Sequence, residues 1–161
     1  MAQFQIGSIS TGTLRPEDLL FNFALALREF EQYWGAEHGQ LYDDAIRFSQ
    51  EYCPHVEEDL ATTEQYEHAN EMLADIQDAL GTYCPPFVYF GTLPGDGADF
   101  GFWVDMERIQ ETLDAAMDLE RNVRNGEWEW QIEDAGVIVN TNDHGSVTVM
   151  DMDRNVLWSV V

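Results

Sequence analysis

The sequence contains no lysine, and its seven basic residues are all arginine. Against them stand 31 carboxylates, so the formal net charge is −24 on 161 residues. A domain of this size usually carries a net charge of roughly 2 to 8 in magnitude, because larger values add self-repulsion to the folded state. A chain so poor in cationic groups lacks the means to hold phosphates, and we expect no direct binding of nucleic acid.

Cysteine is scarce as well. Cys53 and Cys84 each stand in a Tyr-Cys-Pro triplet, and neither belongs to a CxxC motif. A disulfide or half of a metal site is an alternative, but we favour two half-buried thiols at helix ends, where the following proline stops the helix.

The motifs of common catalytic and ligand sites are missing. The four histidines have no HExxH spacing, there is no Gly-x-Ser-x-Gly elbow, and glycines 91, 95 and 97 lack the Gly-Lys-Ser/Thr end of a phosphate loop. Residues 96–99 and 151–155 begin like calcium loops, but the second would place its last ligand beyond Val161, and turn formation explains both. We expect a protein that is not an enzyme and uses no cofactor and no metal.

Long apolar runs are also absent. No window approaches the roughly 18 apolar residues of a membrane span, and the N-terminus shows no basic leader. We therefore expect a cytoplasmic protein without membrane contact. The aromatic content of 12% argues for a packed core rather than disorder, and the length fits a single domain over residues 1–161.

Hydrophobic periodicity predicts an α+β fold, with about four helices packed against a small antiparallel sheet formed largely by the C-terminal third. The expected helices cover residues 16–34, 40–52, 63–80 and 105–123, and the expected strands cover 87–93, 127–133, 137–140, 147–150 and 156–160. We expect residues 3–13 to be extended or turn, and residues 94–99 to be a loop that leads into the fourth helix. Because Phe21 and Leu25 lie opposite the main apolar face of the first helix, we expect that helix to be central.

The third helix is the most informative segment. At 100° per residue its apolar face contains Tyr66, Ala69, Met72, Leu73, Ile76 and Leu80. Within about 80° on the opposite side lie Glu64, Glu67, Glu71, Asp75 and Asp78. With a rise of about 1.5 Å per residue, this acidic ridge is about 21 Å long.

Two further elements repeat the pattern. On the fourth helix, the outer face is predicted to carry Glu107, Glu111, Asp114 and Asp118, and the residues predicted to face inward are Met106, Ile109, Leu113, Ala116, Met117 and Val123. The strand over 127–133 alternates tryptophan with acid, so its wet face is predicted to carry Glu127, Glu129 and Glu133. Arg121 and Arg124 are expected at the end of the fourth helix, where a cation favours the helix dipole.

Simple solvation is the plainest explanation of an acidic helix face. Solvated faces, however, usually mix glutamate with lysine, because opposite charges at i,i+4 stabilise a helix and like charges destabilise it by about 0.2 to 0.5 kcal/mol per pair. The four neighbouring pairs of the third helix are all like-signed, a cost on the order of 1 to 2 kcal/mol. A cationic partner would offset that cost.

Regularly spaced anions on rigid elements resemble a nucleic-acid backbone. In this charge pattern the chain resembles the acidic DNA-mimic inhibitors that phages and plasmids encode against restriction and CRISPR enzymes. The segments 90–103 (FGTLPGDGADFGFW) and 142–158 (beginning NDHGSVTV) also resemble parts of uncharacterised phage and plasmid proteins. The resemblance implies an origin on a mobile element and leaves the target unnamed.

The expected function is thus a non-enzymatic inhibitor, a monomer or small homo-oligomer, that acts in the host cytoplasm. Its two helical ridges would occupy the DNA- or RNA-binding channel of a basic host protein or ribonucleoprotein complex. Two alternatives stay open. One is an immunity protein or antitoxin that masks a basic nuclease toxin, and the other is an acidic surface adapted to high salt.

Overall fold

The computed structural model describes residues 4–34, 38–53, 62–115, 122–124 and 127–160. In these ranges the fold is α+β with four α-helices, as predicted, and it contains two antiparallel sheets where the prediction had one. The elements in chain order are β1 (Gly7–Thr11), α1 (Pro16–Trp34), α2 (Gly39–Tyr52), α3 (Thr63–Thr82), β2 (Val88–Leu93), β3 (Asp96–Val104), α4 (Met106–Ala115), β4 (Asn122–Arg124), β5 (Glu127–Ile132), the 3-10 helix η1 (Glu133–Ala135), β6 (Val137–Thr141), β7 (Val147–Asp151) and β8 (Val156–Val160).

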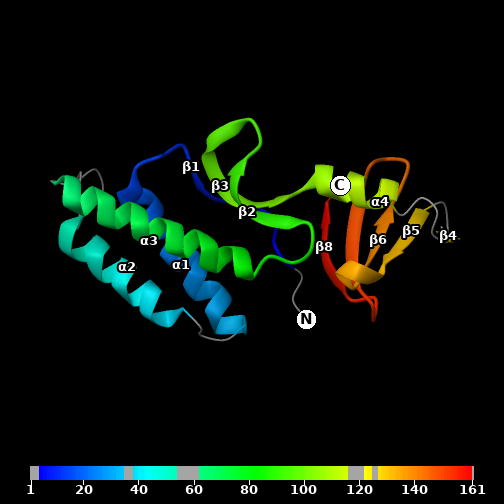
Figure 1. Cartoon of the computed structure of the whole chain (residues 1–161), viewed down its shortest axis with the longest axis horizontal. Coiled ribbons are helices and arrows are strands. Elements are labelled where there is room, and N and C mark those ends of the chain that lie inside the picture. Colours follow the sequence, from blue (N-terminus) through cyan, green and yellow to red (C-terminus); the bar gives the residue numbers. More distant parts are fainter. Residues whose placement is uncertain (1–3, 35–37, 54–61, 116–121, 125–126, 161) are drawn as a thin grey trace. The chain divides into compact units, whose positions relative to one another are not determined.

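The chain forms two compact units that interleave in the sequence (Figure 1). The helical unit comprises residues 7–84 and 89–103, and the sheet unit comprises residues 1–6, 85–88 and 104–161. Compactness of two units and cooperativity of their unfolding are separate properties. The expectation of a single domain therefore stays a prediction.

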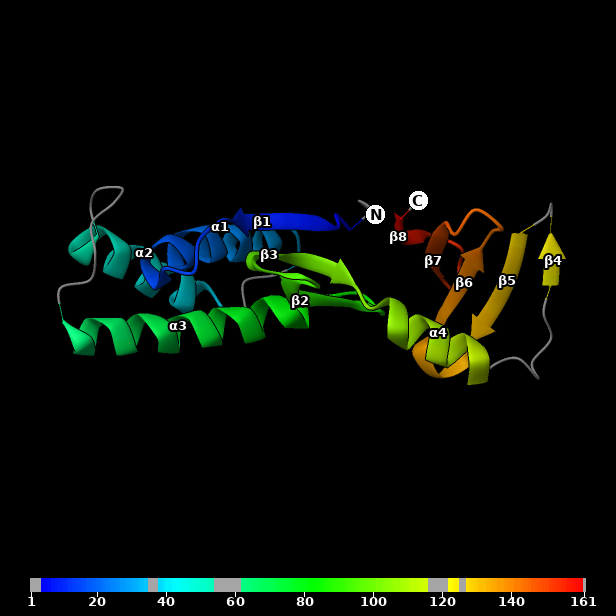
Figure 2. The same ribbon diagram turned by 90° about the horizontal axis from the view of Figure 1, so that it is seen from above.

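In the helical unit, α1, α2 and α3 lie side by side and share one core (Figures 1 and 2). The buried residues include Leu20, Phe23 and Leu27 of α1, Phe48 of α2, and Met72, Ile76 and Leu80 of α3. The ring of Phe23 meets those of Phe90 and Phe100 edge-on, at centroid distances of 5.0 and 5.3 Å. These aromatic contacts attach α1 to the small sheet, whose strand order is β1-β3-β2.

Not every apolar residue of these helices is buried. Phe21 and Leu25 of α1 are 47% and 42% exposed, and Tyr66 of α3 is 47% exposed. Helix α1 is central to its unit, as predicted, because it contacts α2, α3 and β1. Phe21 and Leu25 are nevertheless not part of the buried side, and the inward position predicted for Tyr66 is wrong. The side of α1 that carries Leu20, Phe23 and Leu27 is the one that α2, α3 and the sheet cover.

Strand β3 is the largest difference from the prediction, which placed a loop between residue 94 and the fourth helix. Pro94 and Gly95 form the turn of a β2–β3 hairpin, and Gly95 has a φ of 93°. Gly101 sits in the middle of β3, where a Cβ atom would lie 2.2 Å from the carbonyl oxygen of Gly7 in β1. Gly101 therefore allows β1 and β3 to approach closely.

In the sheet unit, five strands form an antiparallel meander in the order β4-β5-β6-β7-β8. Its core contains Val137, Val139, Val147, Val149 and Trp158, and α4 adds Ile109 and Leu113. The indole nitrogen of Trp158 donates to the carbonyl oxygen of Pro86 at 2.9 Å. The predicted sheet in the C-terminal third is confirmed, and α4 is the helix that packs on it.

The prediction that the fourth helix continues to residue 123 is wrong. Helix α4 ends at Ala115, and residues 122–124 form β4, in which Val123 pairs with Trp128 of β5. In the sequence, Asn125-Gly126 separates these strands, and this dipeptide is a hairpin signal. Arg124 is therefore a strand residue, while Met117, Asp118 and Arg121 lie outside the described residues.

Candidate acidic interface

Helix α3 begins with a capping box. The hydroxyl of Thr62 accepts a hydrogen bond from the backbone N–H of Gln65 at 3.2 Å, and the Gln65 side chain accepts one from the Thr62 N–H at 3.1 Å. These bonds satisfy N–H groups that a helix start leaves without partners. The buried face consists of Ala69, Met72, Leu73, Ile76, Ala79 and Leu80. The helix is thus fixed at its start and along one whole side.

The opposite side of α3 carries the five predicted carboxylates, all of them exposed. We call this set the α3 ridge: Glu64, Glu67, Glu71, Asp75 and Asp78. Within the described ranges, no arginine forms an ion pair with any of them. The imidazole of His68 lies beside the ridge, with its Nδ1 3.8 Å from a carboxylate oxygen of Glu71, and both side chains are exposed.

Four arginines have partners elsewhere. Arg15 binds Glu17 at 3.0 Å, Arg47 pairs with Asp44 three residues before it, and Arg154 holds Glu129. Arg28 donates to the hydroxyl of Tyr42 at 3.1 Å and lies over its ring. These cations are therefore occupied away from the α3 ridge, which leaves its negative charge without a guanidinium partner in the described part of the chain.

The negative charge of the α3 ridge also acts on Tyr52 at the end of α2. The pKa of Tyr52 is raised above its usual range, mainly by a hydrogen bond to Glu51 and by the charge of that carboxylate. The charge of Glu64, at the start of the α3 ridge, acts in the same direction. The sequence alone gave no reason to join these residues, because the packing of α2 against α3 brings them together.

Helix α4 carries a shorter acidic face. Glu107, Glu111 and Asp114 are exposed, and Ile109 and Leu113 on the other side are buried. Met106 was predicted to face inward and is half-exposed instead, at the first residue of the helix. Asp118 lies outside the described residues. Because α3 and α4 belong to different units, each acidic face stands by itself.

The predicted acidic face of β5 is not a set of unpaired carboxylates. Arg154 binds Glu129 through two hydrogen bonds of 2.8 and 2.9 Å, and the Glu129 side chain is only 13% exposed. Arg154 has a φ of 66° and lies in the turn between β7 and β8. The carboxylate of Asp151 stabilises this turn by accepting hydrogen bonds from the backbone N–H and the side-chain amide of Asn155. Those two hydrogen bonds also lower the pKa of Asp151. Glu133 lies in η1 rather than in the strand.

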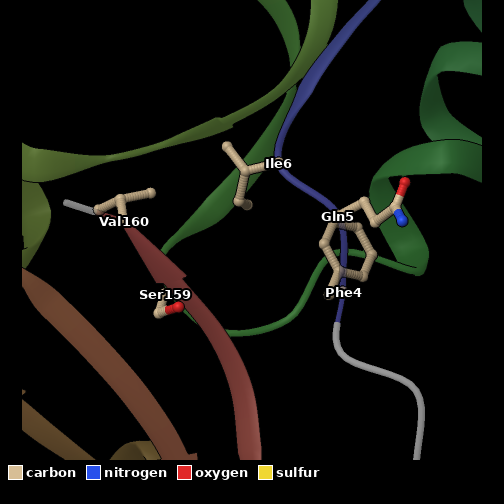
Figure 3. Close-up of a pocket in the computed structure, with 5 residues that line it drawn as sticks. All are labelled: Phe4, Gln5, Ile6, Ser159 and Val160. Atoms are coloured by element: carbon tan, nitrogen blue, oxygen red, sulfur yellow. The ribbon is translucent and has the colours of Figure 1, made fainter.

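A shallow pocket of about 450 Å³ lies between the N-terminal segment and β8 (Figure 3). It is lined by Phe4, Gln5, Ile6, Ser159 and Val160. None of these side chains is a carboxyl, an imidazole or a thiol, so the pocket holds no group that could act as a general acid, a general base or a strong nucleophile.

The two cysteines keep their thiols and form no disulfide, and both are half-buried. Burial raises the pKa of the Cys84 thiol to about 12, although a backbone hydrogen bond from Phe90 acts in the opposite direction. Such a thiol is a poor nucleophile at neutral pH. Across the described ranges, no group of three or more His, Cys, Asp or Glu side chains is placed to hold a metal ion, and no helix is long and apolar enough to span a membrane.

No protein-family model, curated protein or solved structure matches the chain. The features that bear on function are therefore the geometry and charge of its own residues. The strongest of these features is the α3 ridge.

Proposed function

We propose that the protein is a non-enzymatic inhibitor that imitates nucleic acid. In this proposal the α3 ridge occupies the DNA- or RNA-binding channel of a basic host protein or ribonucleoprotein complex, in the cytoplasm of the host cell. One observation carries the proposal: five exposed carboxylates follow one side of a capped, well-packed helix and have no arginine partner among the described residues. The α4 face is a second candidate contact.

The spacing of the ridge supports this proposal. Five charges over about 21 Å give one charge per about 5 Å, whereas one strand of a duplex carries one per about 3.4 Å of axis. The ridge therefore approaches the charge density of a single strand rather than that of a whole duplex. A row of arginines or lysines that follows one phosphate strand would meet a similar series of anions.

The rigidity of the ridge also supports it. A partner gains affinity when the groups it binds are already ordered, because less conformational entropy is lost on association. The capping box and the six buried side chains of α3 hold the backbone beneath the carboxylates. The net charge of −24 would add long-range attraction to a basic channel and raise the association rate at low salt.

The test is a displacement assay with a panel of purified targets: a restriction enzyme, a CRISPR effector complex, a nucleoid-type DNA-binding protein and a basic nuclease toxin. Each target holds fluorescent DNA or RNA, and the protein is titrated in. We compare two triple variants with the same change in charge. The ridge variant is Glu67→Gln, Glu71→Gln, Asp75→Asn, and the matched variant is Glu29→Gln, Glu133→Gln, Asp153→Asn, all at exposed positions off both helical ridges.

We expect the wild type to displace nucleic acid from at least one target, and the ridge variant to be weaker by about 10-fold or more, since close charge pairs at interfaces are coupled by about 1.5 kcal/mol or more. The matched variant should retain most of the inhibition. Failure to displace nucleic acid from any target would overturn the proposal. Displacement from the nuclease toxin alone would favour the immunity-protein alternative.

Stability at low salt distinguishes the inhibitor from the alternative of an acidic surface adapted to high salt. A surface adapted to high salt should lose most of the protein's stability at low ionic strength, because screening is then needed to hold the fold together. An inhibitor that acts at cellular salt should stay folded there. Thermal unfolding followed by circular dichroism at low and high salt decides between them.

A further inference from the structure

The outward side of α1 carries an apolar patch between two opposite charges. Asp18, Phe21, Leu25 and Arg28 fall within about 80° of one another around the helix axis, opposite the buried face. We call these four residues the α1 stripe. Phe21 and Leu25 are nearly half exposed at i,i+4 spacing, which places their side chains next to each other.

The charges at the two ends of the stripe are held in place. Asp18 accepts a hydrogen bond from the hydroxyl of Thr13 at 2.8 Å. Arg28 donates to Tyr42 of α2, and its guanidinium carbon lies 5.4 Å from the centre of that ring. Asp18 also lies 3.9 Å from Nε of Arg15, and the exposed Glu29 follows Arg28. In a chain of net charge −24, the surface around this apolar pair therefore carries two acids and two bases.

The stripe is complementary to itself. If a second copy of α1 packs antiparallel about a two-fold axis that places Phe21 against the second copy's Leu25, the residue numbers of facing pairs have a constant sum. Asp18 then faces the second copy's Arg28, and Arg28 faces the second copy's Asp18. The register that buries the apolar residues thus pairs all four charges, as an isologous interface requires.

We propose that the α1 stripe is the contact surface of a homodimer. A basic partner would be attracted to the carboxylates elsewhere on the chain, and the stripe offers it no net charge. A second copy, by contrast, satisfies both the apolar pair and the charges at either end. The four residues lie along only about 15 Å of helix. Their side chains bury far less surface than the roughly 1,600 Å² of a standard interface, so the dimer should be weak and reversible.

Salt should act on this dimer in an unusual direction. Two copies of a strongly acidic chain repel each other, and added salt screens that repulsion while the apolar contact persists. We therefore expect salt to strengthen dimerisation. Binding to a basic target would show the opposite dependence, so the two associations are distinguishable, and neither result depends on the other.

The test is sedimentation equilibrium of the full chain over a range of concentrations, at about 50 and about 500 mM salt. We expect a monomer–dimer equilibrium that shifts toward dimer at the higher salt. Asp18→Arg and Arg28→Asp each place like charges opposite one another in a homodimer, and each should weaken dimerisation by about 10-fold or more. An equal mixture of the two variants pairs opposite charges at both ends, and should restore dimerisation as a heterodimer.

The mixture of the two charge variants distinguishes lost pairing from lost folding. Mixing can restore dimerisation of two folded variants, but it cannot restore the fold of a variant that does not fold. Phe21→Asp provides an independent variant at an exposed position, with Met106→Asp of α4, similarly exposed, as its matched control. We expect Phe21→Asp to be monomeric and Met106→Asp to dimerise like the wild type. The proposal fails if the wild type is monomeric throughout, if Phe21→Asp still dimerises, or if folded charge variants do not associate when mixed.

Discussion

At Gly101 the small sheet has no room for a side chain. Any Cβ at this position would lie 2.2 Å from the Gly7 oxygen and 2.8 Å from the Cα of Ser8, and these backbone atoms cannot move without breaking the β1–β3 pairing. Gly97 lies in the same strand, and a Cβ at this position would meet nothing within 4 Å. The two glycines therefore form a matched pair for one substitution.

We predict that Gly101→Ala lowers the free energy of unfolding by about 2 kcal/mol or more, because the clash involves backbone. Gly97→Ala should be neutral or slightly stabilising, since alanine restricts the unfolded chain and meets nothing in the folded one. Urea unfolding of both variants checks this. Equal stabilities would contradict the assigned approach of β1 and β3.

Cys84 provides a second prediction for a single residue. With a pKa of about 12, about one thiol in 10,000 is ionised at pH 8, whereas a thiol with the ordinary pKa of 9.0 would be ionised in about one molecule in ten. Alkylation of Cys84 by iodoacetamide at pH 8 should therefore be on the order of 10³ slower in the native protein than in urea. Mass spectrometry of the labelled peptide measures both rates, and similar rates would contradict the burial of this thiol.

The same shift has a consequence for stability. Below pH 9.0 the thiol is neutral in both the folded and the unfolded state, so it adds no pH dependence there. Above that pH the unfolded state loses the proton and the folded state keeps it until about pH 12. The folded state is therefore destabilised progressively across this window as the pH rises.

At the scale of the element, α3 combines a well-packed inner side with an outer side whose charges repel one another. The last turn contains no basic residue, although a cation there would favour the helix dipole. Stability and the proposed function therefore make opposite demands on the same positions. This conflict provides a prediction that simple solvation of the helix does not make.

We predict that Asp75→Lys raises the melting temperature and weakens inhibition together. The substitution removes two like-charge pairs and creates the favourable Glu71–Lys spacing of i,i+4, a change on the order of 1 kcal/mol. For a chain of this size that corresponds to a rise of about 2 to 4 °C. Differential scanning calorimetry measures it, and Glu29→Lys on α1 controls for the change in net charge. A lower melting temperature would contradict the repulsion assigned to the α3 ridge.

Elements also differ in how far their sequences predict them. Helix α3 was predictable because its apolar period is unbroken over five turns, and the Thr62-x-x-Gln65 pattern is a further sequence signal that marks its start. Strand β3 was missed because Gly97 and Gly101 interrupt its pattern, and the reason for Gly101 lies in β1, almost a hundred residues away. The end of α4 was misplaced because acidic residues continue past Ala115 and conceal the hairpin signal.

The candidate site also contains features that the sequence predicts and features that it does not. The positions and exposure of the α3 ridge followed from spacing alone, since a helix with one buried face has only one outer face. Two features required the tertiary structure. These are the pairing of Glu129 with Arg154, which are 25 residues apart, and the field that joins Glu51 and Glu64 at Tyr52.

At the scale of the whole molecule, the interleaving of the two units has a consequence for unfolding. Residues 85–88 and 104–161 belong to the sheet unit, while the intervening β-hairpin belongs to the helical unit, so neither unit is a continuous stretch of chain. We predict a single cooperative transition in urea. Hydrogen exchange should give the same midpoint for α3 amides as for β6 and β7 amides, and midpoints that differ clearly would indicate two domains.

The most direct test of the central claim is the ratio of inhibition constants between the ridge variant and the matched variant, measured on the same target at the same salt. Both variants remove three carboxylates, so total charge is equal and only position differs. The account predicts that the ridge variant is weaker by about 10-fold or more, and that the gap narrows as salt rises. A ratio near one would contradict it, because inhibition would then follow net charge and not the α3 ridge.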